Sequence, residues 1–599
     1  MTLKTLILRS LRHHWRGHLG VLLGAAVGSA ALIGALVVGD SVRLSLRDLA
    51  LQRLGWVEAA MAPSDRFFDQ SISQHTWSAY ALNYRKAAAL RLPATLARQD
   101  GTARANGVQA IGVGPDFWND SVPANLKSIP PRSVVLNEAL AAQLRAKPGD
   151  ELVLRLHKPS ALSREVPITP QNDASIALRV KVHAIAPAEA PGNFNLRASQ
   201  TPPLNVFLPI EELAAAAGIS GKANLLLGAV QGIETRSVRQ LAQDFMPGEL
   251  ELLNPIEIFL LDCFNRIPTP LRPLLEESGR SVEVSKHLNY HLERSSTLSN
   301  LGLELRPLGG SKEIELRSSR IFLEPQVTTS LLQPAVDNPE LDQLIPVYTP
   351  EATSRPLSSL AYLQNIATNA RPILTYLVNQ LRAGEHAVPY SMVTAAGSPL
   401  TPSDMKDDEI VINQWLADDM QLKAGETLDL TYFLVESGAS LVERTNRFRI
   451  RGVVPMEGIH GDRKLMPEFP GLAKAESTQE WDAGFPLVHK IRDQDEAYWK
   501  KYRGTPKAFV TLAAGQRMWV NRFGNLTAIR FPVHANRSVS NVTAAIERSL
   551  LSNIQPSSLG LRFDPVRAEA LAGASQSQDF GGLFIGFSFF LILAALLKH

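Results

Sequence analysis

His287 and His291 are the residues whose types and spacing come nearest to a catalytic or metal-binding motif. Four positions apart, they would share one face of a helix and present two imidazoles to a zinc ion, with Glu293 nearby. The glutamate of an HExxH motif is missing, and Asn289 and Tyr290 stand between the two histidines. The pattern favours solvated histidines over a metal site.

His460 and Asp462, in the segment GIHGD at 458–462, have the side chains of a metal or hydrolytic site, but the setting favours a polar loop. The sequence contains no GxSxG, no SxxK with supporting partners and no GxxxxGK[ST]. We therefore expect no catalytic residues, no cofactor, no metal and no P-loop binding of ATP. A hydrolase that uses the His460–Asp462 loop is kept as a third hypothesis.

The composition indicates a large folded protein and argues against nucleic acid as a partner. The chain has 599 residues, of which 45% are hydrophobic and 20% charged, enough for two or more domains with real cores. The formal net charge of +3 is too small to predict nucleic-acid binding, and no basic stripe with interleaved aromatics is present. The single cysteine, Cys263, excludes an intrachain disulfide and a cysteine-based metal cluster.

Two apolar runs without charged residues enclose this globular sequence. The first covers residues 19–39, and its 21 residues would extend about 31 Å as a helix, the thickness of a bilayer core. The second begins at Gly581 and stops at Lys598 and His599. The sequence therefore predicts two transmembrane helices, with the second one truncated by the end of the chain.

Basic residues set the expected orientation. Lys4, Arg9, Arg12 and Arg16 precede the first run, and no acidic residue occurs before Asp40. An excess of Lys and Arg holds a flank in the cytoplasm. We thus expect a cytoplasmic N-terminus on a cell membrane, with an interfacial helix at 1–18 and residues 40–580 outside the cytoplasm.

A cleaved signal peptide is the alternative for the N-terminus. The run is long for such a peptide, and Gly20, Gly24 and Gly28 form a small-residue face of the kind that packs against another membrane helix. Beyond the run, residues 40–55 continue the helical pattern as a stalk, which Gly55 is suited to end.

The strongest internal signal is a repeat. Residues 134–156 align without a gap to 410–432, with Asn137 matching Asn413 and Gly149 matching Gly425. In both copies a β-branched strand ends at an Asn suited to cap a two-turn helix, and a Gly turn then leads into an alternating strand.

Further segments keep the same order in both halves. Four pairs match: 108–113 with 390–395, 179–187 with 447–455, 205–210 with 507–512, and 224–230 with 525–531. The sequence predicts two related α+β modules, and two unrelated strand-helix-strand units remain the alternative. Between them, Leu303–Arg306 and Ile314–Arg317 are expected to pair across the Gly309–Gly310 turn.

The resulting domain prediction runs the length of the chain. It comprises an interfacial helix 1–18, a first span 19–39, a stalk and connection 40–79, a first module 80–240, an intermediate β-rich and linker region 241–364, a second module 365–550, a return stalk 551–580 and the start of a second span 581–599.

Several segments resemble the FtsX-like permeases of ATP-binding cassette systems. They are the span followed by GDSVRLSLRDLALQRLG (39–55), the approach to the second span (579–597), and VVLNEALAAQLRAKPGDEL (134–152), which looks like the periplasmic core domain of MacB-type permeases. Residues 466–472 and 495–519 are similar to members of this family with an enlarged external domain.

The resemblance implies a permease subunit and its partners. Such subunits have at least four spans, work with cytoplasmic ATPase subunits and a second permease copy in the lipid membrane, and pass ATP-driven movement to an external domain. Export, lipoprotein extraction and mechanotransmission to an external partner are the implied roles. This chain departs from that pattern, because it stops within the second span. A membrane-anchored scaffold without transport activity is the alternative hypothesis.

Overall fold

The computed structural model describes most of the chain, and the statements below concern those residues. They are 5, 9, 11–63, 66–74, 83–118, 122–159, 175–188, 191–197, 199, 201–231, 272–309, 312–332, 368–435, 441–482, 487–534 and 537–576.

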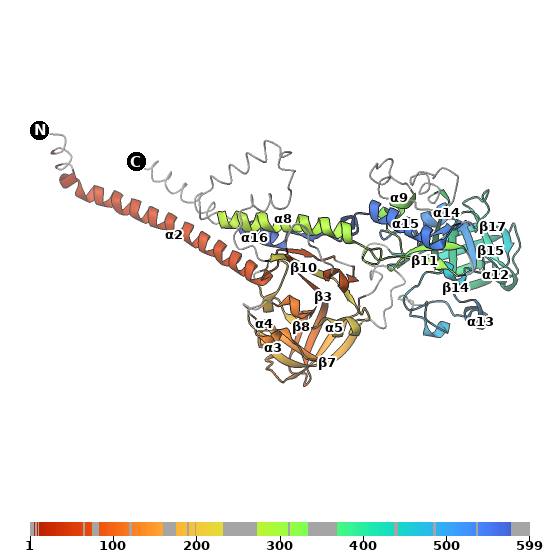
Figure 1. Ribbon diagram of the computed structural model, residues 1–599, viewed down its shortest axis with the longest axis horizontal. Helices are drawn as coiled ribbons and strands as arrows, with labels where there is room; N and C mark the ends of the chain where they lie inside the picture. Colours follow the sequence, from red (N-terminus) through yellow and green to blue (C-terminus); the bar gives the residue numbers. More distant parts are fainter. Residues whose placement is uncertain are drawn as a thin grey trace, which may run out of the picture.

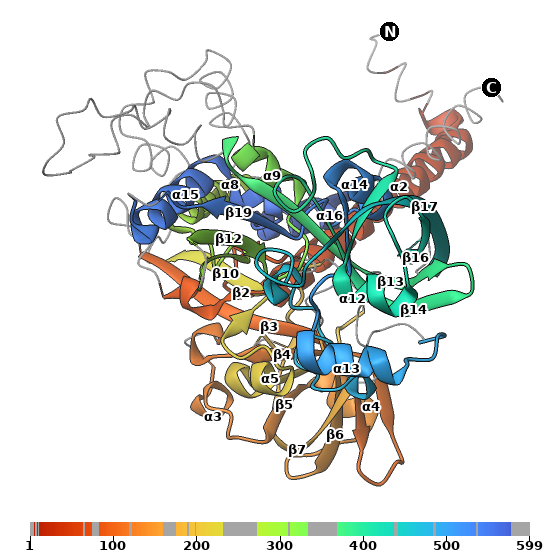
Figure 2. The ribbon, with the colours of Figure 1, turned by 90° about the vertical axis from the view of Figure 1, so that its right-hand side faces the viewer.

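Two β-rich bodies lie next to each other, and a long helix projects from the first (Figures 1 and 2). This helix, α2, runs over Trp15–Leu54, and Gly55 follows it with φ +59°. A second long helix, α8 (Arg272–Ser295), lies along the first body and leads toward the second. The sequence placed residues 241–364 in a β-rich and linker region, but the described part of that region begins with this helix.

The first body is built on a sheet that closes on itself. Among the described residues nine strands form it, in the order β20 (Phe563–Asp564), β1 (Ala59–Met61), β10 (Leu225–Gln231), β3 (Asn83–Arg98), β4 (Arg104–Val113), β8 (Asn205–Pro209), β5 (Ser133–Asn137), β7 (Ser175–Ala186) and β6 (Glu151–His157). Strand β6 also pairs with β3, from Ala94↔Leu156 to Arg98↔Leu152. The strands from β3 to β6 therefore form a closed six-stranded ring, called here the first barrel.

The second body repeats this arrangement. Its nine described strands are ordered β11 (Leu303–Leu308), β12 (Glu313–Ser318), β19 (Ala528–Pro532), β13 (Arg371–Ala383), β14 (His386–Ala396), β18 (Ala508–Thr511), β15 (Glu409–Asn413), β17 (Leu441–Val454) and β16 (Thr427–Val435). Strand β16 pairs back with β13, from Gln380↔Thr431 to Arg382↔Asp429. The strands from β13 to β16 form the second barrel.

The two barrels agree in strand direction as well as in order. In each, the second strand of the ring pairs in parallel with the third and the fourth with the fifth, whereas the other ring pairings are antiparallel. This likeness is one of topology, and descent by duplication stays a prediction. The hairpin β11–β12 pairs with β19 and so extends the second sheet, whereas the sequence assigned it to the intermediate region.

Alternating burial explains why these segments form barrel strands. In β6, Leu152, Leu154 and Leu156 are buried while their neighbours are exposed or half-buried, as expected for a strand with one face on a core. Helices α5 (Ile210–Ala216) and α14 (Leu512–Trp519) follow β8 and β18 and pack on the sheets beside them.

The remaining elements are short or lie outside the rings. They are α3 (Ala124–Lys127), α4 (Glu138–Leu144), α9 (Pro325–Leu332), α12 (Gln414–Met420), α13 (Asp493–Tyr502), α15 (Val539–Asn553), α16 (Val566–Gln576), the pair β2 (Phe68–Asp69) and β9 (Lys222–Ala223), and the 3-10 helices η1 (Gln70–Ser73), η2 (Pro115–Phe117), η3 (Pro191–Asn193), η6 (Arg463–Leu465), η7 (Thr478–Glu480) and η8 (Pro556–Leu559).

One connection differs greatly between the barrels. Residues 187–204 join β7 to β8 in the first barrel, whereas the equivalent connection from β17 to β18 uses residues 455–507 and contains α13. Much of the motif that resembles permeases with an enlarged external domain lies in this long connection.

Within the part of the chain that the structure describes, we find no helix with the length and apolar character needed to cross a membrane. Residues 19–39, the expected first span, lie inside α2. The expected second span, 581–599, lies outside the described residues. Of the expected return stalk, the structure describes residues 551–576, which contain β20 and α16.

Candidate functional site

The base of the stalk is where three helices meet the first sheet. Helix α16 packs against both α2 and α8, and α8 lies on β1, β10 and β20. Arg47 of α2 donates to Glu277 of α8 at 3.1 Å, and Arg567 of α16 lies 4.0 Å from the same carboxylate. One acidic side chain on α8 thus holds arginines from both other helices.

We call the place where α2, α8 and α16 meet the first sheet the stalk base, and Glu58 lies at its centre. Its side chain is only 7% exposed, and Oε1 lies 2.7 Å from Nε of Arg280 in α8. The Val230 backbone N–H donates to Oε2 at 3.2 Å, and the Ser281 hydroxyl donates to the Glu58 carbonyl at 2.7 Å. Burial raises the pKa of Glu58, although the charge of Arg280 acts in the opposite direction.

Arg567 ties α16, the last helix among the described residues, to the end of α2. Its guanidinium donates to the carbonyls of Gly55 and of Val57, the latter at 3.3 Å. Burial lowers the pKa of this arginine, and the charge of Glu58 opposes that shift. Asn289 of α8 adds a further link, because its side-chain amide exchanges two hydrogen bonds, of 2.8 and 3.0 Å, with the Phe563 backbone.

Apolar packing joins the same elements. Ala50 and Leu54 of α2 share a buried core with Val566 and Ala570 of α16 and with aromatic side chains of the first barrel, among them Phe117, Trp118 and Phe207. A cavity of about 360 Å³, lined by Trp56, Arg85 and the charged groups Glu58, Glu277, Arg280 and Arg567, opens beside this core. These polar and apolar contacts join α2, α8 and α16 to the first sheet.

The histidine pair lies at this junction too. His287 Nδ1 is 2.7 Å from the Tyr84 hydroxyl of β3, and the ring centroids of His287 and His291 are 5.5 Å apart. Glu293 is exposed. The expectation of solvated histidines is wrong, because both rings are half-buried between α8 and β3. Burial, together with the neighbouring His291, lowers the pKa of His287 to about 4.

His460 and Asp462 belong to the second body, and the structure brings them into separate contacts. The His460 Nε2 lies 3.0 Å from the Leu400 carbonyl, and its ring packs edge-on against Phe509. Asp462 begins the short helix η6 and accepts a hydrogen bond from Arg530 at 2.7 Å. Both side chains are thus engaged in holding the loop.

The three glycines of the expected packing face lie in α2. A methyl group added at Gly20 or Gly24 would meet no described atom within 4 Å, so this helix face has room for a neighbour there. Gly28 lies in the same helix one turn further on. Cys263 lies outside the described residues, and among the described residues no group of three or more His, Cys, Asp or Glu is placed to hold a metal ion.

The repeat positions have the same local geometry in both barrels. The Asn137 side chain accepts from Leu140 N at 3.2 Å, and the Asn413 side chain accepts from Leu416 N at 2.8 Å, so each caps the helix that follows its strand. Gly149 and Gly425 have φ values of +100° and +96°, in a region that L-amino acids with side chains rarely adopt.

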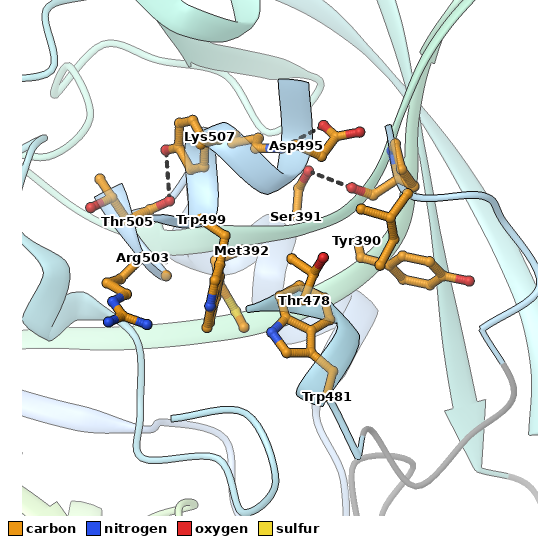
Figure 3. Close-up of a pocket in the computed structure, with 14 residues that line it drawn as sticks. Tyr390, Ser391, Met392, Thr478, Trp481, Asp495, Trp499, Arg503, Thr505 and Lys507 are labelled. Atoms are coloured by element: carbon orange, nitrogen blue, oxygen red, sulfur yellow. Dashed lines mark hydrogen bonds and ion pairs between the residues drawn. The ribbon is translucent and has the colours of Figure 1, made fainter. Parts of the chain in front are cut away.

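Sequence reasoning missed a buried lysine in the second barrel. Lys507 is 3% exposed, and its ammonium lies 4.4 Å from the ring centre of Trp415 and 4.7 Å from that of Tyr498. Asp495 of α13 is 3.4 Å from the ammonium (Figure 3). Burial lowers the pKa of Lys507 to about 8, although the charge of Asp495 opposes this shift.

The surroundings of this lysine leave little space. The cavity beside it, about 20 Å³, has room for about one water molecule, and Met392, Trp481 and Trp499 line it (Figure 3). Arg492 completes the cluster by bridging Asp495 and Asp419 at 2.8 and 2.7 Å. The cluster therefore locks the long connection onto the second barrel. The one available sequence signal was a lysine at the start of an apolar strand, KAFVTL.

No family model matches the chain, and no curated protein matches it. The solved structures that match include the crystal structure of the periplasmic region of MacB from Actinobacillus actinomycetemcomitans, with a TM-score of 0.18 and 10% sequence identity, over 33% of this chain and 69% of that chain.

Proposed function

We propose that this chain is the permease subunit of an ATP-binding cassette transporter, with its two barrels outside the cytoplasm. In this proposal a separate ATPase supplies the energy, and α2 and α16 carry movement from the membrane to the barrels. The external domain then acts as a mechanical transmitter in export, lipoprotein extraction or the control of an external partner.

The meeting of α2 and α16 at the stalk base carries this proposal. These helices come from opposite ends of the described chain, and they pack against each other and against α8. Arg567 of α16 donates to the carbonyls of Gly55 and Val57, which follow α2 directly. In this proposal a shift of either helix therefore displaces the other. Helix α8 continues through residues 296–302 into β11 of the second sheet, so the same shift reaches both bodies.

The membrane anchor is proposed from the sequence and from the exposure of α2. Residues 19–39 contain no charged side chain. Large apolar side chains of this part of α2 are between 47% and 69% exposed, namely Leu19, Leu22, Leu23, Val27, Ile33 and Val37. An exposed apolar surface of this kind is stabilised by lipid or by other membrane helices.

The alternative is a membrane-anchored scaffold, which would have the same barrels and the same stalk but no ATPase partner. The hydrolase hypothesis has less support, because His460 contacts a backbone carbonyl and Asp462 pairs with Arg530. In the proposed transmitter the purified external domain, residues 56–570, has no zinc and no activity toward ATP.

The decisive experiment measures ATP hydrolysis in proteoliposomes. The separate ATPase that the proposal requires is reconstituted with the full chain, with an Arg567→Ala variant, or with neither. We expect several-fold stimulation by the native chain and loss of most of it in the variant. A matched Arg562→Ala variant removes an exposed arginine that pairs with Asp564, outside the stalk-base contacts, and should stimulate normally.

Absence of stimulation by the native chain would favour the scaffold. A reporter fused after residue 100 tests the orientation separately, since activity of a cytoplasm-only reporter there contradicts an external domain.

A further inference from the structure

A cavity of about 240 Å³ lies between the β11–β12 hairpin and the long connection of the second body. Arg306 and Arg317 line it from the hairpin, and Lys464 and Glu468 line it from the connection. This volume admits a side chain or the end of a peptide, since sites for drug-sized ligands start at roughly 300 Å³.

The two hairpin arginines are held in position by carboxylates of their own hairpin. Arg317 donates to Glu304 at 2.9 Å, and Arg306 lies 2.8 Å from Glu315. Their side chains are 22% and 25% exposed, so each guanidinium is oriented by the protein while part of it faces the cavity. Planar guanidinium groups arranged in this way suit recognition of a carboxylate.

Glu468 occupies that position in the structure. Its Oε1 accepts a hydrogen bond from Arg317 and another from Arg306, the latter at 3.4 Å. The hydrogen bond from Arg317 lowers the pKa of Glu468, so this carboxylate is ionised at neutral pH. The side chain is nevertheless 66% exposed.

Exposure separates Glu468 and Glu304, which are 66% and 54% exposed, from Glu315. Glu315 is 3% exposed and also pairs with Arg530, itself 7% exposed, so removing it would leave buried charges without a partner. An exposed ion pair contributes only about 0–1 kcal/mol. An external carboxylate could therefore replace Glu468 at little cost, whereas Glu315 is fixed.

Charge and backbone geometry support a binding role. The lining contains three cations, Arg306, Arg317 and Lys464, and three carboxylates, so displacing Glu468 leaves a net positive cavity. Ile321, which also lines the cavity, has φ +70°. A β-branched residue rarely adopts this conformation, and such strain persists where the surrounding structure enforces it, often at binding sites.

We propose that Arg306 and Arg317 bind a carboxylate of an external acidic peptide, and that Glu468 occupies the site as an internal substitute until the peptide displaces it. This inference goes beyond the transmitter role and stands whether or not the chain works with an ATPase. It assigns a contact for a partner of the second barrel.

The test measures binding of a fluorescent hexaglutamate peptide to the full chain in detergent by anisotropy. Glu468→Ala should bind the peptide at least tenfold more tightly than the native chain, because the internal competitor is gone. Adding Arg317→Gln or Arg306→Gln to Glu468→Ala should reverse this gain. Arg317→Lys, which keeps the charge, should retain part of it and covers the case that the glutamine variant does not fold.

The matched control is Glu457→Ala, which removes one exposed carboxylate from the same connection, outside the cavity lining, and should leave affinity unchanged. Competition by glutarate identifies the source of the carboxylate. Weak competition supports a peptide, and competition at the peptide's own affinity supports a small dicarboxylate at the same arginines. Equal affinity of the native chain and Glu468→Ala, or gains of the same size in Glu457→Ala, would overturn the proposal.

Discussion

The two barrels differ most at one equivalent position. In the first, Asn205 begins β8 next to Asn137, beside the pairing Leu136↔Val206. In the second, Lys507 stands just before β18 next to Asn413, beside the pairing Ile412↔Ala508. Both side chains are buried, but Asn205 donates to the carbonyls of Gly192 and Phe194, whereas Lys507 pairs with Asp495.

The difference follows from the length of the connection that each side chain must hold. The short connection of the first barrel brings its own carbonyls to the amide of Asn205. The long connection of the second barrel brings α13, and Asp495 of this helix forms a buried charge pair with Lys507. A buried pair is costly to break, because the remaining charge has no partner. The two barrels thus hold the connection that precedes β8 or β18 in different ways, one by amide hydrogen bonds and the other by a charge pair.

The largest effect is expected from breaking the charge pair. Asp495→Ala leaves Lys507 buried without its carboxylate and should lower the free energy of unfolding of the second barrel by about 3–5 kcal/mol. Hydrogen exchange of β15 and β18 measures this loss, with β5 and β8 of the first barrel as an internal reference.

Two variants control that experiment. Asp493→Ala removes an exposed carboxylate from the same helix and should cost less than about 1 kcal/mol. A Lys507→Met/Asp495→Leu double variant should recover most of the lost stability, since both charges of the buried pair are then absent and Arg492 keeps Asp419 as its partner. A small loss in Asp495→Ala, shared equally by both barrels, would contradict the comparison.

A smaller loss of stability is expected at the equivalent helix caps Asn137 and Asn413, where the two barrels have the same geometry. Asn137→Ala and Asn413→Ala each remove a helix cap and leave a carbonyl without its amide donor, that of the half-buried Pro203 or of the buried Pro506. Loss of a cap costs about 1 kcal/mol, and an unsatisfied buried group about 1–3 kcal/mol. We expect about 2–3 kcal/mol in each case, confined to the barrel that carries the change.

Urea unfolding with site-resolved hydrogen exchange distinguishes the two losses, and Asn106→Ala, at an exposed position, should stay within about 0.5 kcal/mol. Asn413 also donates to the Tyr498 hydroxyl at 3.1 Å. Its variant should therefore loosen α13 as well, an effect without a counterpart in Asn137→Ala.

The smallest effect concerns acidification at the first body. The pKa of His287 is about 4 in the folded protein, below the ordinary value of 6.5, so the unfolded state binds the proton more readily between these values. Stability from this group is complete above pH 6.5 and is lost as the pH falls toward 4. The charge of Glu283 raises the pKa of His287, whereas His291 lowers it. Burial and then the charge of Lys86 lower the pKa of His291.

We expect the hydrogen-exchange protection factors of α8, which are corrected for the pH dependence of unprotected amides, to fall between pH 6.5 and pH 4.5 relative to those of β15, the reference. A His287→Gln variant should remove most of this dependence. If α8 and β15 respond to pH alike, the histidine contact does not limit the opening of α8.

The sequence predicted much of the repeated geometry because that geometry is local. Asn137 and Asn413 cap neighbouring residues, and Gly149 and Gly425 serve turns within the same segments, so each pattern could be read from adjacent positions. The pairing of β3 with β6, the transfer of β11–β12 to the second sheet and the return of β20 to the first could not. Each joins strands distant in sequence, and no local pattern specifies such a partner.

The stalk base and the Lys507 cluster were less predictable from the sequence, because their residues come from segments that are not adjacent in the chain. Lys507 and Asp495 lie in neighbouring segments, but their pairing depends on how the long connection folds back. Glu58, Arg280 and Arg567 come from three separate parts of the chain, and none belongs to a recognised motif. The histidines were noticed from their spacing, and only the position of Tyr84 shows that they are half-buried.

The pairing of β1 with β20 has a consequence for the order of events during synthesis. Ala60 and Met61 wait for Asp564 and Phe563, which leave the ribosome only after both barrels have been made. The strands of the first barrel lie between residues 83 and 209 and can close long before that. The contacts of α16 at the stalk base are therefore the last of the described chain to form, so a ribosome that stalls within the second barrel leaves α2 packed on the first barrel without α16.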